Sequence, residues 1–199
     1  MSGYSLGSPG GSLSDESFVG AGDGAKEAGR VGEVKTGNVL NQIAQTSERV
    51  VLHDLSIPGG GLKANIDHAV IGEGVVLVVD SKNWAPGFYW TLGGVSRRGL
   101  TDVPHADKKT MEMIQERLVP YLPGYLIRRP VVAIWSSKDS AKVWPGLLTP
   151  PGADAIRGEA LVRRIKKSVP DMPPNPDLLE KMTDLLRNGK PKRRRTVSL

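Results

Sequence analysis

The sequence predicts an α/β fold in which a mixed central sheet is flanked by helices. The first reason is order, because segments with helical spacing alternate with short β-branched segments as helix, strands, helix, strand, helix. The second is size, since 199 residues, 39% of them hydrophobic, suffice for one domain with a substantial core. This pattern favours α/β over an all-helical or all-β fold.

The folded domain is predicted to span residues 25–188, between two segments of unusual composition. Residues 1–24 are rich in Gly and Ser and lack hydrophobic periodicity, which is typical of a disordered segment. Residues 189–199 are too charged to form a core and predict a disordered basic tail. We expect this tail to bind nucleic-acid phosphates through Lys190, Lys192, Arg193, Arg194 and Arg195.

Composition excludes several classes of protein. The longest apolar run, residues 75–79, is far shorter than the roughly 20 residues of a membrane helix. The first 20 residues carry no Lys or Arg, unlike a secretory signal, and the chain has no Cys for disulfides or thiolate metal sites. We therefore expect a cytoplasmic protein, and its net charge of +6 favours polyanionic partners.

The first half of the domain is predicted to contain one helix and two hairpins. The helix has an apolar stripe that ends at Ile43 and Ala44, and each hairpin has glycines at its turn. The predicted elements are a helix at 25–46, a strand at 50–55, a hairpin at 65–71 and 75–82, and a hairpin from 88–92 to Val95.

The second half is predicted to contain three helices and one buried strand. Asn175 and Pro176 have the residue types preferred at a helix N-cap and first position. The predicted elements are a helix at 106–119, a strand at 130–135, and helices at 157–168 and 177–187.

The hairpin at 65–82 brings two acids face to face. If Glu73 and Gly74 form a two-residue turn, Asp67 lies directly opposite Asp80 with Lys82 on the same face. Opposed Cβ atoms are about 5 Å apart, so two carboxylates there need a compensating charge. A divalent cation supplies it, and Mg²⁺ is commonly held by one or two carboxylates.

Asp80-Ser-Lys82 is one of three tripeptides in the sequence with an acid two residues before a lysine, and its position in the predicted hairpin distinguishes it from the other two. Glu33-Val-Lys35 and Asp107-Lys-Lys109 have the same spacing, but only Asp80-Ser-Lys82 ends an apolar strand opposite another acid. Glu33 nevertheless lies on the apolar row of its predicted helix, with Gly29 and Gly37 one turn away on either side. An inward-facing acid needs a partner, and we expect Glu33 to meet the same metal or Lys82.

The segment Asn65–Trp84 (NIDHAVIGEGVVLVVDSKNW), with Gly32-Glu33 and the strand at 51–55, resembles the nuclease-related domain family. That family belongs to the PD-(D/E)XK, or restriction-endonuclease-like, superfamily, and the resemblance covers about residues 28–135. It implies a restriction-endonuclease-like mixed sheet flanked by helices. The family usually has Glu in place of Asp80 and often has Gln near Asp107.

The same resemblance implies Mg²⁺-dependent or Mn²⁺-dependent cleavage of phosphodiester bonds. Glu33, Asp67 and Asp80 would then hold the metal ion, and Lys82 would position water or stabilise negative charge. We expect a nuclease acting on nucleic acid, with DNA favoured over RNA. Two alternatives stay open: a nucleic-acid-binding module on the same fold without catalysis, and a scaffold that binds partners through its basic tail.

Overall fold

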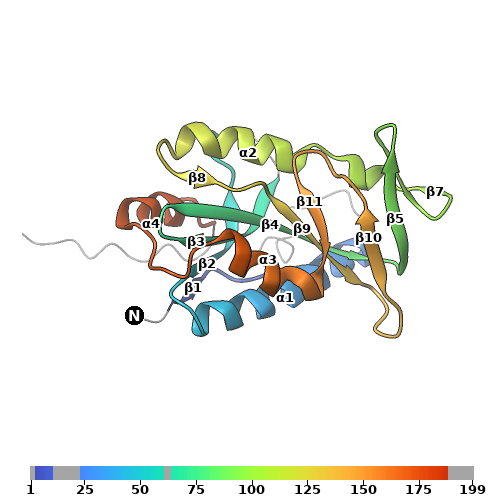
Figure 1. Ribbon diagram of the computed structural model, residues 1–199, viewed down its shortest axis with the longest axis horizontal. Coiled ribbons are helices and arrows are strands. Elements are labelled where there is room, and N and C mark those ends of the chain that lie inside the picture. The colour runs from blue at the N-terminus through green and yellow to red at the C-terminus, as the bar shows by residue number, and fades with distance from the viewer. Residues whose placement is uncertain (1–2, 11–22, 61–63, 188–199) are drawn as a thin grey trace, which may run out of the picture.

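The computed structural model describes residues 3–10, 23–60 and 64–187. Its helices and strands follow the alternating order predicted from the sequence (Figure 1). They are β1 Ser5–Leu6, α1 Asp23–Gln45, β2 Val50–Ser56, β3 Asn65–Gly72, β4 Val75–Trp84, β5 Gly87–Leu92, β6 Val95–Arg98, β7 Thr101–Asp102, η2 Pro104–Asp107, α2 Thr110–Tyr121, β8 Leu126–Ile127, β9 Val131–Ser136, β10 Val143–Leu147, β11 Asp154–Arg157, η3 Gly158–Ala160, α3 Leu161–Ser168 and α4 Pro176–Thr183.

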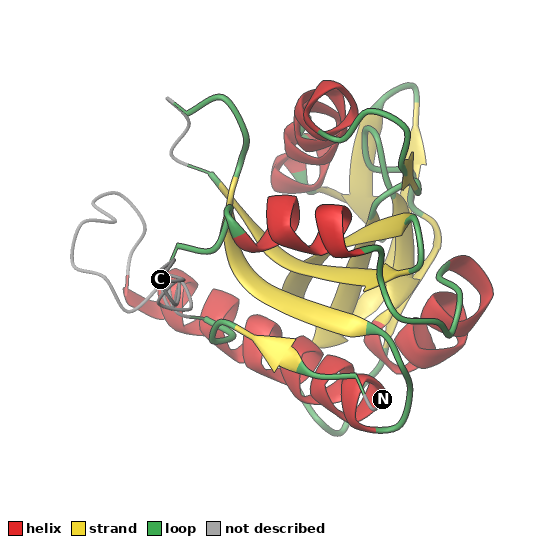
Figure 2. Cartoon of the chain, turned by 90° about the vertical axis from the view of Figure 1, so that its left-hand side faces the viewer, coloured by secondary structure: helices red, strands yellow, loops and turns green. Residues whose placement is uncertain are grey.

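The main sheet is mixed, as predicted. Its strand order is β1-β2-β3-β4-β9-β11, and β8 pairs with β4 outside that path. Strands β2, β3 and β4 are antiparallel neighbours, whereas β4, β9 and β11 run parallel. Helices lie on both sides of the strands (Figure 2), which confirms the α/β class with helices flanking a mixed sheet.

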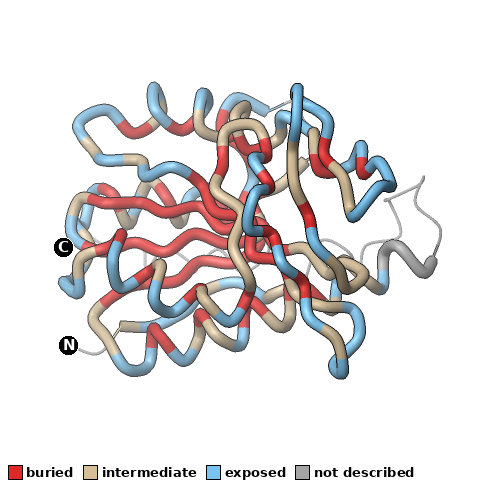
Figure 3. Tube along the Cα trace, turned by 45° about the vertical axis from the view of Figure 1, so that its right-hand side comes forward, coloured by how far each residue is buried: buried red, intermediate tan, exposed pale blue. Residues whose placement is uncertain are grey.

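Alternation along each strand separates the core into two layers. In β4, Val76 and Val78 pack with residues of α2 and α4, whereas Leu77 and Val79 pack with residues of α1 and α3. The central strands are buried along most of their length (Figure 3). Asp80 and Lys82 continue the α2-facing set of β4 beyond its apolar part, and Ser81 continues the α1-facing set.

The β3–β4 hairpin has the predicted register. Gly72 pairs with Val75, and the pairing continues to His68 opposite Val79, so the next position places Asp67 opposite Asp80. Within this turn the positive φ is at Glu73, which has φ 51°, and not at Gly74, although glycine adopts such a φ more readily. Hydrogen bonds outside the hairpin hold Glu73 there: its N–H donates to Met172 O at 3.2 Å, and its carbonyl accepts from Asn175 N at 2.8 Å.

Three predicted helices differ from the observed ones at their boundaries. The helix predicted from residue 106 begins at Thr110, because Pro104–Asp107 forms the separate turn η2. Residues 154–157 extend the sheet by pairing with β9, so the helix predicted from 157 begins at Leu161. The last helix has the predicted Asn175 cap and Pro176 start but ends at Thr183.

The prediction of disorder for residues 1–24 is wrong for residues 3–10. Ser5–Leu6 forms β1, which adds to the edge of β2, and Val51 N donates to Tyr4 O at 3.0 Å. Backbone pairing orders this segment although it lacks apolar periodicity. The predicted basic tail, with Lys190, Lys192, Arg193, Arg194 and Arg195, lies outside the described residues. In the part of the chain described here, no helix has the length and apolar character that crossing a membrane requires.

A second, smaller sheet lies at the opposite end of the molecule from α4 (Figure 1). Its strand order is β10-β5-β6-β7, which includes the predicted hairpin β5–β6. Because β5 begins shortly after β4 ends, the polar end of β4 lies where the two sheets meet.

Candidate functional site

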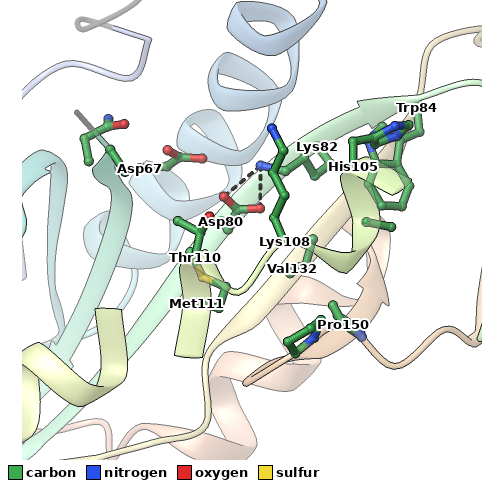
Figure 4. Close-up of a pocket in the computed structure, with 14 residues that line it drawn as sticks. Asp67, Asp80, Lys82, Trp84, His105, Lys108, Thr110, Met111, Val132 and Pro150 are labelled. Carbon is green, nitrogen blue, oxygen red and sulfur yellow. Dashed lines mark hydrogen bonds and ion pairs between the residues drawn. The ribbon is translucent and has the colours of Figure 1, made fainter. Parts of the chain in front are cut away.

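The polar end of β4 opens into a cavity of about 330 Å³. Asp67 and Asp80 both line it, together with Lys82, so the two opposed carboxylates face the same space as predicted (Figure 4). The rest of the wall comes from the start of β3, the last residue of β4, η2, the start of α2, strand β9 and the loop after β10. Those lining residues are Ala64, Asn65, Trp84, His105, Ala106, Lys108, Thr110, Met111, Val132, Pro150 and Pro151.

Lys82 is the counter-charge of this carboxylate pair. Its Nζ donates to Asp80 Oδ1 at 2.8 Å and lies 2.6 Å from Asp80 Oδ2. Asp67 accepts a hydrogen bond from the backbone N–H of Ser81 at 2.9 Å, which fixes it against β4. Burial alone would lower the pKa of Lys82, but the charges of Asp80 and Asp67 outweigh it and raise that pKa. Lys82 therefore carries a positive charge at neutral pH.

Asp67 and Glu33 lie in surroundings that favour their protonated forms. Burial and then the charge of Asp80 raise the pKa of Asp67 to about 7. Burial and then the charge of Asp67 raise the pKa of Glu33 to about 8, against the lowering effect of Lys82. The cluster thus holds more carboxylates than one lysine neutralises, and their mutual repulsion adds to the effect of burial on these pKa values.

Glu33 interacts electrostatically with Asp67 and Lys82 because α1 packs closely on β4, although it does not line the cavity. Gly32 has no side chain at the contact, and a Cβ built there would lie 3.1 Å from the backbone nitrogen of Asn83. Glu33 is buried, as its apolar row predicts, and its pKa responds to both Asp67 and Lys82. The sequence therefore identified correctly that this acid points inward.

The expected three-carboxylate metal group is not assembled in this structure. Among the described residues, no three Asp, Glu or His side chains lie close enough together to hold one metal ion. Asp67 and Asp80 fit Mg²⁺ as a pair, because the ion keeps several waters and takes only one or two carboxylates. Asp80 Oδ2 is buried and lies 2.6 Å from Lys82 Nζ, so a metal ion bound there would share this oxygen with the ammonium group.

Sequence reasoning missed Asp54. It lies in β2 at the register position next to Asp67, between the His53–His68 and Leu55–Ile66 pairs. It is 2% exposed with φ 56°, and its Oδ2 accepts no hydrogen bond from the described residues, although Asn65 donates to Oδ1 at 3.1 Å. An acid inside the otherwise apolar run VVLHDL was the signal that could have identified it.

A chain of neutral polar groups supports the site from the α1 side. His53 Nε2 lies 2.9 Å from Asn41 Oδ1, the two histidine Nδ1 atoms are 2.7 Å apart, and His68 Nε2 lies 3.0 Å from Ser81 Oγ. Burial lowers the pKa of His53 to about 4 and that of His68 well below its usual value. Both rings are therefore neutral, and each nitrogen donates or accepts once along the chain. His68 therefore has a structural role, because it links His53 to Ser81 beside the site.

Asp107, near the place where a Gln is common in the family resembled, takes no part in the cavity wall. Its Oδ2 accepts from Ser96 N at 3.1 Å and so ties η2 to β6. Trp84, the last residue of β4, stacks on Tyr89 with ring centroids 5.0 Å apart. Its indole also contacts His105 edge to face at 5.2 Å, and both residues line the cavity.

Comparison with known proteins identifies the family of the chain. A family model described as "Nuclease-related domain" matches residues 28–134, which covers most of α1, all of β2–β8, part of β9 and all four predicted site residues. No curated protein and no solved structure matches the chain significantly.

Proposed function

The chain belongs to the nuclease-related domain family, and from that premise we propose that it is a Mg²⁺-dependent nuclease that hydrolyses phosphodiester bonds, with DNA as the favoured substrate. The observation that carries the proposal is the arrangement of Asp67 and Asp80 on one face of the sheet, where both line the cavity together with Lys82, which is paired to Asp80. Carboxylate oxygens are ligands for Mg²⁺ or Mn²⁺, and a phosphodiester needs cationic groups beside them.

Asp67 and Asp80 are the proposed metal ligands, and Glu33 is a further carboxylate in the same electrostatic environment. A metal ion bound there would polarise the scissile phosphate and lower the pKa of the attacking water. Lys82 neutralises negative charge that develops on the phosphate, because it stays protonated and is fixed beside Asp80. The Ser81 N–H keeps Asp67 oriented toward the same space.

Incubation with DNA and RNA substrates in Mg²⁺, Mn²⁺ or EDTA tests the proposal. We expect cleavage with either metal and none with EDTA. Lys82→Ala should reduce turnover by about 10²–10³-fold, the usual effect of removing one group that stabilises transition-state charge. Lys109→Ala is the matched control, since Lys109 is the lysine of the tripeptide Asp107-Lys-Lys109, which has the same spacing, and it does not line the cavity.

Undiminished cleavage by purified Lys82→Ala protein would place the activity elsewhere. Metal-independent binding of nucleic acid without any cleavage would instead favour a binding module on the same fold. Asp67→Ala distinguishes these two functions: an enzyme loses turnover, whereas a binding module has none to lose and keeps its affinity.

A further inference from the structure

The cavity extends well beyond the charged groups that the proposed hydrolysis uses. One end contains Asp67 and Asp80, Trp84 and His105 lie together at the other, and Lys82 lies between them (Figure 4). The wall between these ends is largely apolar and comes from η2, α2, β9 and the loop after β10. Its apolar residues are Ala106, Met111, Val132, Pro150 and Pro151.

The size of this space limits what can enter it. Its volume of about 330 Å³ is at the lower end of the range for small-molecule pockets, about 300–1,000 Å³. A single nucleotide is small enough for a cavity of this size. A base pair with its two backbones is too large for it, since the major groove of a duplex is by itself about 12 Å wide.

The charges around the cavity suit a phosphate at the carboxylate end. Lys108 lines the cavity from the segment before α2 and adds a second ammonium group near Lys82. The charges of Lys108 and Lys82 both lower the pKa of His105, after the larger effect of its burial, so all three groups lie near one another. A phosphate near Lys82 and Lys108 would leave the attached base beside the apolar and aromatic wall.

We propose that this cavity binds a single unpaired nucleotide, and that the substrate is therefore a single strand or an unpaired end rather than a fully paired duplex. This inference rests on the proposed nuclease function and specifies its substrate class. The base occupies the space between Trp84, His105 and the proline loop, where a pairing partner has no room. Contact of a base with an aromatic wall does not depend on base identity, so little sequence preference is expected.

The test measures both binding and cleavage with one labelled oligonucleotide, offered as a single strand and as a blunt duplex. Binding is measured in EDTA by fluorescence anisotropy, so that it does not depend on turnover. We expect the full-length protein to bind the single strand about tenfold more tightly than the duplex, the effect of about one stacked base. Cleavage in Mg²⁺ should show the same preference.

Two variants test whether this cavity causes the preference. Thr110→Trp places a bulky ring in the cavity from the start of α2, and it should remove the single-strand preference. Glu116→Trp adds the same ring to an exposed position of α2 and should leave the preference unchanged. Lys108→Ala, at an exposed position that folding tolerates, should weaken single-strand binding several-fold even if Thr110→Trp fails to fold.

Equal binding of single strand and duplex by the wild type, or a preference that Thr110→Trp and Lys108→Ala both retain, would overturn this inference and leave the nuclease proposal standing. No binding or cleavage of either substrate would overturn the nuclease proposal, and this inference with it.

Discussion

Protons and a metal ion compete for the same carboxylates at the site. Asp67 and Glu33 have pKa values of about 7 and about 8, both raised first by burial. A carboxylate must be deprotonated to bind a metal ion, so binding releases protons that these groups hold near neutrality. Without a cation, the folded chain therefore holds protons on groups that lose them in the unfolded chain.

This difference predicts how stability depends on pH when metal is chelated. A carboxyl group whose pKa is raised by folding stabilises the fold while it is protonated, so the contribution is present at low pH and is lost as pH rises through the folded pKa. We expect the melting temperature in EDTA to fall between about pH 7 and pH 8.5, because at lower pH the neutral His53 and His68, whose pKa values are lowered by burial, make stability rise with pH and offset this effect. Thermal denaturation across that range is the measurement, with Asp67→Asn as the variant that should fall less.

Added Mg²⁺ should reverse this loss where the carboxylates are ionised. The increase in melting temperature on adding Mg²⁺ should be larger at high pH than at low pH, because fewer protons are displaced. A melting temperature in EDTA that rises with pH over this range would contradict the assigned direction for Asp67 and Glu33.

At the scale of elements, the contact between α1 and β4 places Glu33 of the helix near the carboxylates of the sheet. Gly32 permits this contact, because a Cβ there would meet the Asn83 nitrogen at 3.1 Å and the Lys82 carbonyl carbon at 3.2 Å. Glu33 follows Gly32 directly in the sequence, so any shift of the helix moves this carboxylate. The spacing of α1 from β4 is therefore part of the site's geometry.

Gly32→Val should separate these two elements. The branched side chain must displace backbone rather than a flexible side chain, which typically costs about 1–3 kcal/mol of stability. Nuclease turnover should fall further than the lost stability explains, because Glu33 and Lys82 move apart. Denaturant unfolding and turnover are both measured, with Gln42→Val on the exposed face of α1 as the control for helix propensity. Wild-type turnover in a stable Gly32→Val protein would show that the close contact is unnecessary.

Local patterns predicted the elements that carry the site better than those that surround it. The register of β3 and β4 follows from a two-residue turn and alternating side chains, so the opposition of Asp67 and Asp80 was predictable. Residues 154–157 have no such local signal, because they become a strand only by pairing with β9. The position of Asp54 beside Asp67 was not predictable for the same reason, since it depends on the pairing of β2 with β3. The distance from Glu33 to the other acids depends on helix packing, which periodicity does not specify.

At the scale of the whole molecule, the site lies where the two sheets meet. Most of the net positive charge, in contrast, belongs to the last ten residues of the sequence. Residues 190–199 contain five basic residues and no acid, against a net charge of +6 for all 199 residues. The proposed catalytic residues all lie between residues 33 and 82. Binding of polyanions and chemistry at the cavity are therefore predicted to be separable functions of one chain.

Truncation after Gly189 tests that separation. Each neutralised phosphate of duplex DNA contributes about 0.9 to the slope of log affinity against log salt, so loss of all five tail contacts would change that slope by up to about 4.5. We expect the truncated protein to bind nucleic acid several-fold more weakly at moderate salt and to keep its turnover at low salt, because Asp67, Asp80 and Lys82 are retained. Titrations at three salt concentrations measure the slopes of both proteins. Matching slopes would show that the tail does not contact the nucleic acid, whereas loss of turnover at low salt would show that the two functions are not separable.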